Sequence, residues 1–282
     1  MRTAIVTGAS SGIGAACGRA LAAKGFRVCL TARREERLAQ LCEEVNSAHG
    51  RDHAVYCTGE VTEAPVRQRT LGLAMADGSS VDVLVNSAGF ALAGGVEDID
   101  LKATRKQFEV NALAYLAWMQ LVGPMMREHG GGRIINIGSV SGLMAFPGLG
   151  AYAASKFAVE AISDAARREY RPWGVKVILV EPGPIATEIW DVAQKLSTGL
   201  VRDWRESPFR RLYEQQIERA RKLAAGEGPP PEIVAKIVCH AACARRPRAR
   251  YYVPWNARLV KLLAHLPAWL QDWLIGRMIK VR

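Results

Sequence analysis

A tyrosine and a lysine four residues apart could form one site for proton transfer. Tyr152 and Lys156 would lie on the same face of a helix, because residues four apart are neighbours on a helix surface. A free tyrosine has a pKa of about 10 and exchanges protons poorly at neutral pH. An ammonium group beside it favours the phenolate, so we expect Lys156 to lower that pKa and Tyr152 to act as a general acid/base. The alternative is a surface pair, because this spacing is short and common.

A glycine-rich turn follows the first predicted strand. Residues 3–7 are apolar and β-branched, which predicts a buried strand, and a helical pattern follows the turn. Strand, glycine turn and helix are the setting of a dinucleotide site, because the turn and the helix N-terminus offer backbone N–H groups to a pyrophosphate. The residues expected to line this site are Gly8, Ser10, Ser11, Gly12, Ile13 and Gly14.

The residues after the second predicted strand bear on the choice between NAD(H) and NADP(H). A site for NAD(H) expects a carboxylate about here, but Arg33 and Arg34 follow the strand at 26–32. A guanidinium suits a 2′-phosphate. We therefore expect NADP(H), with Arg33 as its main contact. The alternative is that the two arginines only begin the next helix, predicted over 34–47, where Arg34 is expected to belong.

Strand patterns alternate with helical patterns along most of the chain. This alternation predicts an α/β fold, a Rossmann-type doubly wound parallel β-sheet with helices on both faces and a helical C-terminal extension. Ligands of such sheets bind at the carboxyl ends of the strands, where Asn86 and Ser139 stand. Strands are expected over 3–7, 26–32, 53–58, 81–85, 133–138 and 250–255, and helices over 34–47, 62–76 and 103–129.

Two polar residues in this pattern have a functional and a structural interpretation. Asn111 stands in an otherwise apolar stretch of the helix predicted over 103–129, and a buried amide needs partners or a water. The alternative is a satisfied core amide. Ser139 ends a strand just before the Tyr152 helix, and by itself it could be a simple turn residue.

Taken together, the motifs resemble those of the short-chain dehydrogenase/reductase superfamily over about residues 1–190. The resemblance rests on T-G-A-S-S-G-I-G at 7–14, N-S-A-G at 86–89, Asn111, Ser139, Y-A-A-S-K at 152–156 and P-G-P-I-A-T at 182–187. It implies an enzyme that moves a hydride between a nicotinamide and a carbonyl carbon without a metal. It also implies a homodimer or homotetramer, formed through helices equivalent to 103–129 and 151–170.

The resemblance implies a role for each matching residue. Tyr152 would be the general acid/base, and Lys156 would lower its pKa and bind the nicotinamide ribose. Ser139 would bond the substrate oxygen, and Asn111 would keep a water that links Lys156 to solvent. The other cofactor contacts that it implies are Glu60, Val61, Asn86, Ala88, Gly89, Pro182, Gly183, Ile185 and Thr187.

The sequence departs from the family pattern at three positions. Glu60 stands where an aspartate usually contacts adenine, and Ser87 replaces the second asparagine of the usual N-N-A-G. Ser11 stands where many NADPH-specific members have a basic residue. The expectation of NADP(H) therefore rests on Arg33 alone.

The last third of the chain, after Thr187, contains none of the motifs that carry the family resemblance. We expect residues 1–255 to form one catalytic domain, within which a helical segment over 188–225 covers the substrate. This segment carries Trp190, Trp204, Phe209 and Tyr213. These aromatic residues suggest a bulky apolar substrate such as a steroid, retinoid or long-chain ketone; the alternative is that they pack on the core.

Residues 256–282 form a basic, amphipathic tail. The net charge of the chain is +11, and residues 244–282 contain nine basic residues and one acid. The tail resembles a helix that lies on a membrane surface, but packing over the substrate or against a second subunit is slightly favoured. Its apolar stripe consists of Leu259, Leu262, Leu263, Leu266, Trp269, Leu270, Trp273, Leu274 and Met278.

Other features narrow the setting of the protein. We expect a cytoplasmic protein, because a strand begins directly after Met1 where a signal peptide would stand, and the six scattered cysteines fit a reducing compartment. The charge pattern contains no nucleic-acid recognition motif.

The leading function is an NADP(H)-dependent carbonyl reductase or alcohol dehydrogenase. The alternatives are an NAD-dependent alcohol dehydrogenase and a cofactor-binding regulator without turnover.

Overall fold

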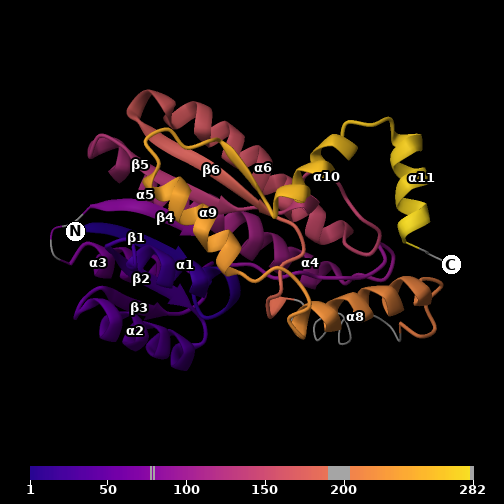
Figure 1. The fold of residues 1–282 in the computed structure, drawn as a ribbon, viewed down its shortest axis with the longest axis horizontal. Coiled ribbons are helices and arrows are strands. Elements are labelled where there is room, and N and C mark those ends of the chain that lie inside the picture. The colour runs from indigo at the N-terminus through magenta and orange to yellow at the C-terminus, as the bar shows by residue number, and fades with distance from the viewer. Residues whose placement is uncertain (77, 79, 190–203, 280–282) are drawn as a thin grey trace.

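Parallel strands form the central sheet of the protein in the order β3-β2-β1-β4-β5-β6-β7 (Figure 1). The computed structural model describes residues 1–76, 78, 80–189 and 204–279. The chain reverses its direction of travel across the sheet between β1 and β4, which creates the switch point where ligands of such sheets bind. The strands are β1 (Arg2–Thr7), β2 (Phe26–Ala32), β3 (Ala54–Thr58), β4 (Val81–Asn86), β5 (Gly132–Ile137), β6 (Val175–Pro182) and β7 (Arg250–Val253).

Helices cover both faces of this sheet, which confirms the predicted fold class (Figure 1). Helices α1, α2 and α9 pack on one face around Phe26 and Leu30, and α3, α5 and α6 pack on the other around Trp118. Apolar strand residues are therefore buried from both sides, as expected of parallel strands. The bounds are α1 (Gly12–Ala22), α2 (Glu35–His49), α3 (Ala64–Ala74), α5 (Ala114–Glu128), α6 (Gly150–Tyr170) and α9 (Glu232–Cys243).

The helix predicted over 103–129 contains a π-helical turn that its sequence did not reveal. It runs as α4 (Leu101–Phe108), a π turn (Glu109–Leu113) and α5. The N–H of Ala114 donates to the carbonyl of Glu109, five residues earlier. Such turns widen a helix locally and are frequent at functional sites. The turn contains Asn111, so this residue stands at a distortion of the helix and not in a regular apolar stripe.

The C-terminal region is helical, as predicted. It contains α8 (Arg210–Ala224), then α10 (Arg258–Leu263) and α11 (Ala268–Met278) beyond β7 (Figure 1). Strand β7 is two residues shorter than the predicted 250–255, because Pro254 has no N–H to continue the ladder and the chain turns into a 3₁₀ helix. Trp190 lies outside the described residues. Within the described part of the chain, no helix has the length and apolarity needed to cross a bilayer.

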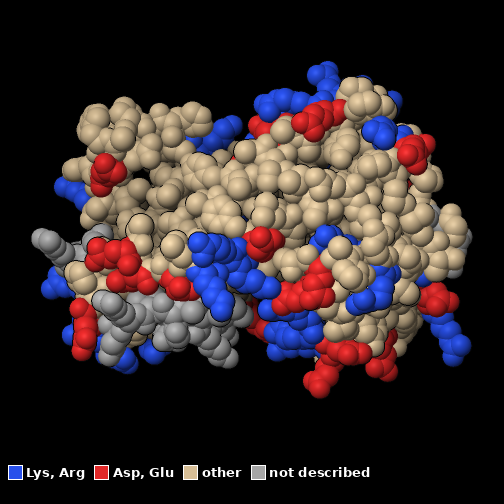
Figure 2. Space-filling view, turned by 180° about the vertical axis from the view of Figure 1, so that it is seen from behind, with Lys and Arg blue, Asp and Glu red and all other residues tan. Residues whose placement is uncertain are grey.

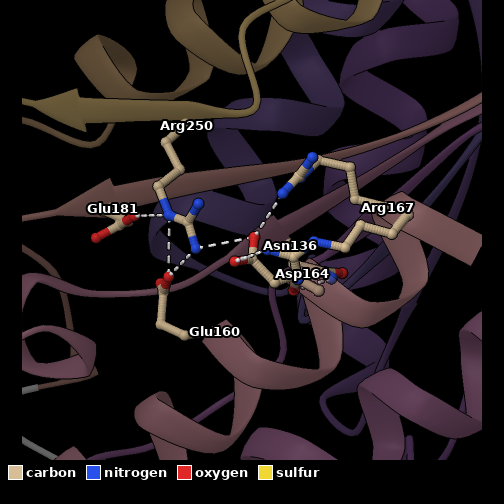
Figure 3. Close-up of polar contacts among 8 residues, drawn as sticks. Asn136, Glu160, Asp164, Arg167, Glu181 and Arg250 are labelled. Carbon is tan, nitrogen blue, oxygen red and sulfur yellow. Dashed lines mark hydrogen bonds and ion pairs between the residues drawn. The ribbon is translucent and has the colours of Figure 1, made fainter. Parts of the chain in front are cut away.

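A buried ion cluster joins α6 to the edge of the sheet (Figure 3). Arg250 on β7 binds Glu160 Oε2 and Asp164 Oδ1 of α6 through Nη2, at 2.9 and 3.0 Å, and its Nε lies 3.3 Å from Glu181 Oε1 of β6. Burial and the nearby Glu160 raise the pKa of Glu181 to about 8, against the charge of Arg250. Burial also raises the pKa of Glu160. The cluster therefore retains a proton at neutral pH while it fixes the helix that carries Tyr152.

We predict that Glu181→Gln changes how stability depends on pH. A carboxyl whose pKa rises from 4.5 to about 8 on folding stabilises the fold at low pH, and that contribution is lost as the pH rises through this window. The unfolding free energy of the wild type should fall relative to that of the variant between about pH 5 and 8, by at most ~1.4 kcal/mol per pH unit. Urea unfolding at several pH values measures this difference.

Glu227→Gln, which removes an exposed carboxylate outside the cluster, is the matched control. A difference between wild type and Glu181→Gln that stays constant from pH 5 to 8 would contradict the prediction.

Candidate active site

Helix α6 presents Tyr152 and Lys156 on one face, toward the carboxyl end of β5. Both are buried, with 8% and 4% of their surface exposed. Lys156 Nζ donates to the carbonyl of Ile137 at 2.8 Å and lies 5.9 Å from the centroid of the Tyr152 ring. Ser139 follows two residues after Ile137, so the structure brings Ser139, Tyr152 and Lys156 together as their spacing suggested. The alternative of a surface Tyr-Lys pair is excluded by their burial.

Ser139 is placed to bind an oxygen together with Tyr152. It precedes a short 3₁₀ helix (Val140–Gly142), and its Oγ accepts the Ser141 N–H at 3.1 Å. This contact uses a lone pair and leaves the hydroxyl hydrogen to donate. The Ser139 side chain lies near enough to Tyr152 to oppose the rise of its pKa. The two hydroxyl groups are thus neighbours, which is an arrangement suited to a carbonyl or alkoxide oxygen.

Burial has the largest effect on the pKa values of Tyr152 and Lys156. It raises the pKa of Tyr152, and Ser139 only partly opposes this. It also lowers the pKa of Lys156 to about 8, against the charge of Glu160 one turn further along α6. The sequence led us to expect a lowered pKa for Tyr152, but desolvation by burial raises it. The hydroxyl therefore stays protonated at neutral pH, which is the form that can give a proton to an alkoxide.

Asn111 ties the loop after β4 to α6. Its Oδ1 accepts the Phe90 N–H at 3.0 Å, and its Nδ2 donates to the Phe90 carbonyl at 2.9 Å and to Ser155 Oγ at 3.1 Å. Both donors of the amide are engaged with the protein. The side chain therefore has the partners that a buried core amide needs, and a water held by Asn111 for Lys156 stays a prediction.

Two positioning residues were missed in the sequence. The Tyr115 hydroxyl donates to the Ile137 carbonyl at 3.3 Å, and its ring centroid lies 5.4 Å from Lys156 Nζ. Thr7 Oγ1 accepts the N–H groups of Ser87 and Ala88 at 3.0 and 3.1 Å, so it holds β1 against the turn after β4. Each had a signal: Tyr115 stands one helical turn after Asn111, and Thr7 directly precedes the glycine turn.

The glycine-rich turn fits a dinucleotide. A Cβ on Gly14 would lie 2.3 Å from the Gly8 carbonyl oxygen, and a Cβ on Gly8, whose φ is +68°, would lie 2.7 Å from Ala88 Cα. The backbone is thus packed closely where a pyrophosphate must approach it. Helix α1 begins at Gly12 with no acidic residue in its first turn and, among the described residues, no side chain capping it. Its N–H groups and dipole therefore suit an anion.

Comparison with known proteins decides the family. Residues 2–196 match the model of the short chain dehydrogenase family. The chain belongs to this family. It is 33% identical over 268 residues to the uncharacterized oxidoreductase YusZ of Bacillus subtilis, covering 95% of this chain and 94% of that protein. It is 34% identical over 273 residues to the NADPH-dependent 3-dehydrocapnine reductase of Ornithobacterium rhinotracheale, covering 94% and 93%.

Solved structures agree with this assignment. A variant of actinorhodin polyketide ketoreductase crystallised with NADPH superposes with a TM-score of 0.75 at 27% identity, covering 91% of this chain and 97% of that one. The protein is thus a short-chain dehydrogenase/reductase, an oxidoreductase whose solved structural neighbours include complexes with NADPH and NADP.

Several residues that are expected to contact the cofactor shape the site through the backbone. A Cβ on Gly89 would lie 3.2 Å from Asn111 Oδ1 and 4.0 Å from Lys156 Nζ, and a Cβ on Gly12 would lie 3.3 Å from the Thr187 side chain. Among the other expected contacts, Val61, Ala88 and Ile185 are buried, Pro182 ends β6, and the Gly183 N–H donates to Val253 at 2.7 Å.

The side chain of Asn86 is used inside the protein. It is fully buried, and its Nδ2 donates to Asn136 Oδ1 at 2.9 Å; Asn136 in turn donates to Ser163 of α6 at 2.8 Å. This amide chain lies between the sheet and α6. Asn86 therefore supports the site by holding β4, β5 and α6 in register, and its contact with a cofactor would be through its backbone.

The arginines after β2 point in different directions. Arg33 Nη1 lies 3.4 Å from Glu60 Oε1, and its side chain is 65% exposed. Arg34 turns back toward the glycine turn, where Nη2 donates to Ser11 Oγ at 2.5 Å and Nε to Ser10 Oγ at 3.2 Å. The sequence assigned Arg34 to the following helix, but it precedes that helix and its guanidinium lies on the dinucleotide turn. Arg34 therefore joins Arg33 as a candidate phosphate contact.

Aromatic residues of the covering segment have mixed surroundings. The Tyr213 hydroxyl donates to Asp98 Oδ2 at 2.8 Å and accepts the Gly95 N–H at 2.9 Å, so Tyr213 packs on the protein as the alternative interpretation held. Ile189, near the start of the same segment, packs with Ala91 against Tyr152. The wall that Ala91 and Ile189 form beside Tyr152 is therefore apolar.

Proposed function

We propose that this dehydrogenase is an NADP(H)-dependent enzyme that interconverts a ketone or aldehyde and an alcohol. The observation that carries the proposal is the closeness of the Ser139 and Tyr152 hydroxyls beside the buried Lys156 ammonium, next to the glycine turn. A nicotinamide bound there supplies or accepts the hydride. The protein then has to bind the substrate oxygen and move one proton to or from it.

Each residue of the site has a part in that proton transfer. Ser139 and Tyr152 bind the substrate oxygen, and Tyr152 gives its proton to the forming alkoxide in reduction or takes one from the alcohol in oxidation. Lys156 stabilises the phenolate left behind. The Ile137 carbonyl and the Tyr115 ring hold the ammonium in place. A non-catalytic regulator has no need of this set, which argues against that alternative.

Two further observations support this proposal. The raised pKa of Tyr152 keeps its hydroxyl protonated at neutral pH, which is the form that gives a proton in the reductive direction. Arg33 and Arg34 stand where an NAD(H) site has a carboxylate, and they support NADPH over the NAD-dependent alternative. The relative named as an NADPH-dependent reductase fits this choice.

The apolar wall beside Tyr152 supports a bulky apolar substrate, such as a steroid-, retinoid- or lipid-like carbonyl compound. Ala91 and Ile189 form this wall. Helix α8 lies over the segment that leads into α6, where Gln216 Nε2 donates to the Pro147 carbonyl at 3.1 Å. An apolar group of the substrate would replace water against these surfaces, which is the main source of affinity for such compounds.

We predict that NADPH binds more tightly than NADH and that this preference depends on the arginines after β2. Loss of a charge-assisted bond to the 2′-phosphate should weaken NADPH binding by roughly 10-fold or more in Arg33→Ala or Arg34→Ala, with little change for NADH. Titration followed by nicotinamide fluorescence measures both, with Arg51→Ala as an exposed control outside the site. Equal affinity of the wild type for the two cofactors would remove the NADP(H) proposal.

We predict that Tyr152→Phe loses turnover but keeps cofactor binding. Removing the general acid should lower kcat by roughly 10²- to 10⁴-fold, while the NADPH affinity changes little. Oxidation of NADPH with a panel of steroid, retinoid and long-chain ketones measures the rate. Tyr170→Phe removes the hydroxyl of a half-buried tyrosine at the other end of α6 and should retain activity. A Tyr152→Phe enzyme as active as wild type would refute the mechanism.

We propose that the protein forms a dimer or tetramer through the long α4–α5 helix and α6. Leu113 and Phe157 are large apolar residues on these helices, and both are exposed in the single chain. A second copy would cover them, which is the usual reason that such residues stand on a surface.

We propose a second contact surface on the tail, toward an anionic membrane. The lobe formed by α10 and α11 has a mostly uncharged surface, at the upper left of Figure 2. Trp269 and Trp273 are exposed there, and Arg258 and Arg277 stack on Trp255 and Trp273, so basic groups stand beside apolar anchors. This exposure favours a partner outside the chain over packing of the tail on its own substrate site.

We predict that vesicles containing phosphatidylserine bind the protein and that Trp269→Ser/Trp273→Ser reduces this binding severalfold. The change removes the apolar anchors and leaves the charge intact. Vesicle flotation measures it, with pure phosphatidylcholine as the uncharged surface and Trp173→Ser, an exposed tryptophan outside the tail, as the control. Unchanged flotation of the double variant, or of a chain lacking 257–282, would exclude the membrane contact.

A further inference from the structure

Glu188 binds two arginines beside the dinucleotide turn. It directly follows Thr187, and its Oε2 lies 2.7 Å from Arg34 Nη1 while its Oε1 is bonded to Arg37 Nη1. Burial raises the pKa of Glu188, but the bonds from Arg34 and Arg37 outweigh it and hold that pKa below its usual value. A carboxylate of the chain therefore sits on a pair of guanidinium groups that come from the start of α2.

The donor set around this carboxylate suits a phosphate. Arg34 also donates to the hydroxyls of Ser10 and Ser11, so two guanidinium groups and two serines of the turn lie together. One carboxylate leaves part of the positive charge of the two arginines uncompensated. A phosphate monoester carries a charge of about −1.5 to −2 at neutral pH and has three acceptor oxygens, so it matches this set better.

Space for such a group lies next to the arginines. A cavity of about 330 Å³ between α1 and α2 is lined by Ser10, Arg37 and Gln40, among others. The same arginine that holds Glu188 thus borders a volume open to a ligand at the glycine turn. A ligand phosphate entering from this side would meet Arg37 while Glu188 still occupies it.

We propose that Glu188 competes with the 2′-phosphate of NADP(H) for Arg34 and Arg37. When NADP(H) binds, its phosphate replaces the Glu188 carboxylate on these two arginines. The inference rests on the proposed preference for NADP(H) and adds the residue that limits it. Glu188 therefore weakens the binding of NADP(H) below the affinity that Arg34 and Arg37 alone would give. The affinity for NAD(H), which lacks the 2′-phosphate, is almost unaffected. Glu188 is thus a specificity-determining residue that acts through two arginines.

The exposure of the ion pairs sets the size of the effect. The side chains of Arg34, Arg37 and Glu188 are 40–46% exposed. Exposed pairs are individually weak, so a ligand phosphate can displace the carboxylate. Breaking two such pairs corresponds to roughly a 3- to 10-fold change in affinity.

The test is Glu188→Gln in the full-length enzyme. The amide keeps the shape of the side chain and removes its charge. Calorimetric titration with NADPH, NADH, 2′,5′-ADP and 5′-AMP should show roughly 3- to 10-fold tighter binding of the two ligands that carry a 2′-phosphate, with little change for the other two. Glu214→Gln, which removes the carboxylate of an exposed arginine pair on α8, should change none of the four affinities.

A second variant tests the route of the effect. Because Glu188 acts through Arg34 and Arg37, the gain from Glu188→Gln should shrink when Arg37→Ala is added. Unchanged NADPH affinity in Glu188→Gln, or an equal gain for NADPH and NADH, would overturn the proposal.

Failure of the proposed function gives a different result. If NADP(H) is not preferred, the wild type binds NADPH and NADH alike and Arg34→Ala changes neither. If only the role of Glu188 is wrong, the preference is present and depends on Arg34, but Glu188→Gln leaves it as it was.

Discussion

The burial of the Lys156 ammonium is the constraint on which the site depends. A buried cation is costly unless it is bonded, and its desolvation lowers the pKa of Lys156 to about 8. The Ile137 carbonyl, the Tyr115 ring and the charge of Glu160 compensate for that cost. These partners come from β5, from α5 and from α6 itself. The position of one ammonium group therefore requires three elements to keep their places.

The same charge connects the site to the edge of the sheet. Glu160 raises the pKa of Lys156 and binds Arg250, which also approaches Glu181 (Figure 3). A buried ion pair is weak evidence of stability, because desolvation offsets its attraction. Its role here is to fix positions: Arg250 joins β6, β7 and α6, so the helix that carries Tyr152 cannot shift without exposing charged groups.

The sequence predicted those features of the fold and the site that depend on the regular spacing of residues in a helix or a strand. The four-residue spacing of Tyr152 and Lys156 predicted their shared helix face, and apolar runs predicted six of the seven strands to within about two residues. Strand β6 (Val175–Pro182) was not predicted. The π turn at Asn111 was not predictable, since apolar periodicity does not report which carbonyl an N–H reaches. The pKa of Tyr152 was also misjudged, because desolvation depends on burial that the pair itself does not reveal.

Arg34 illustrates a different limit. A residue at a helix start can point along the helix or back across the preceding loop, and only the position of Ser10, Ser11 and Glu188 decides between them. Glu188 is distant in sequence, so no local pattern links it to Arg34. Contacts of this kind depend on how the ends of β1, β2 and β6 meet at the carboxyl edge of the sheet.

The two halves of the site therefore differ in physical character. The proton-transfer groups are buried, because a dry surrounding strengthens each electrostatic contact and holds Tyr152 in its protonated form. The arginines at the glycine turn are exposed and paired only weakly, which suits the proposed recognition of a phosphate that enters from water. The buried groups around Tyr152 and the exposed arginines around Glu188 thus occupy separate parts of one sheet edge. Thr187 and Glu188, which are adjacent in the chain, lie at the boundary between these two parts.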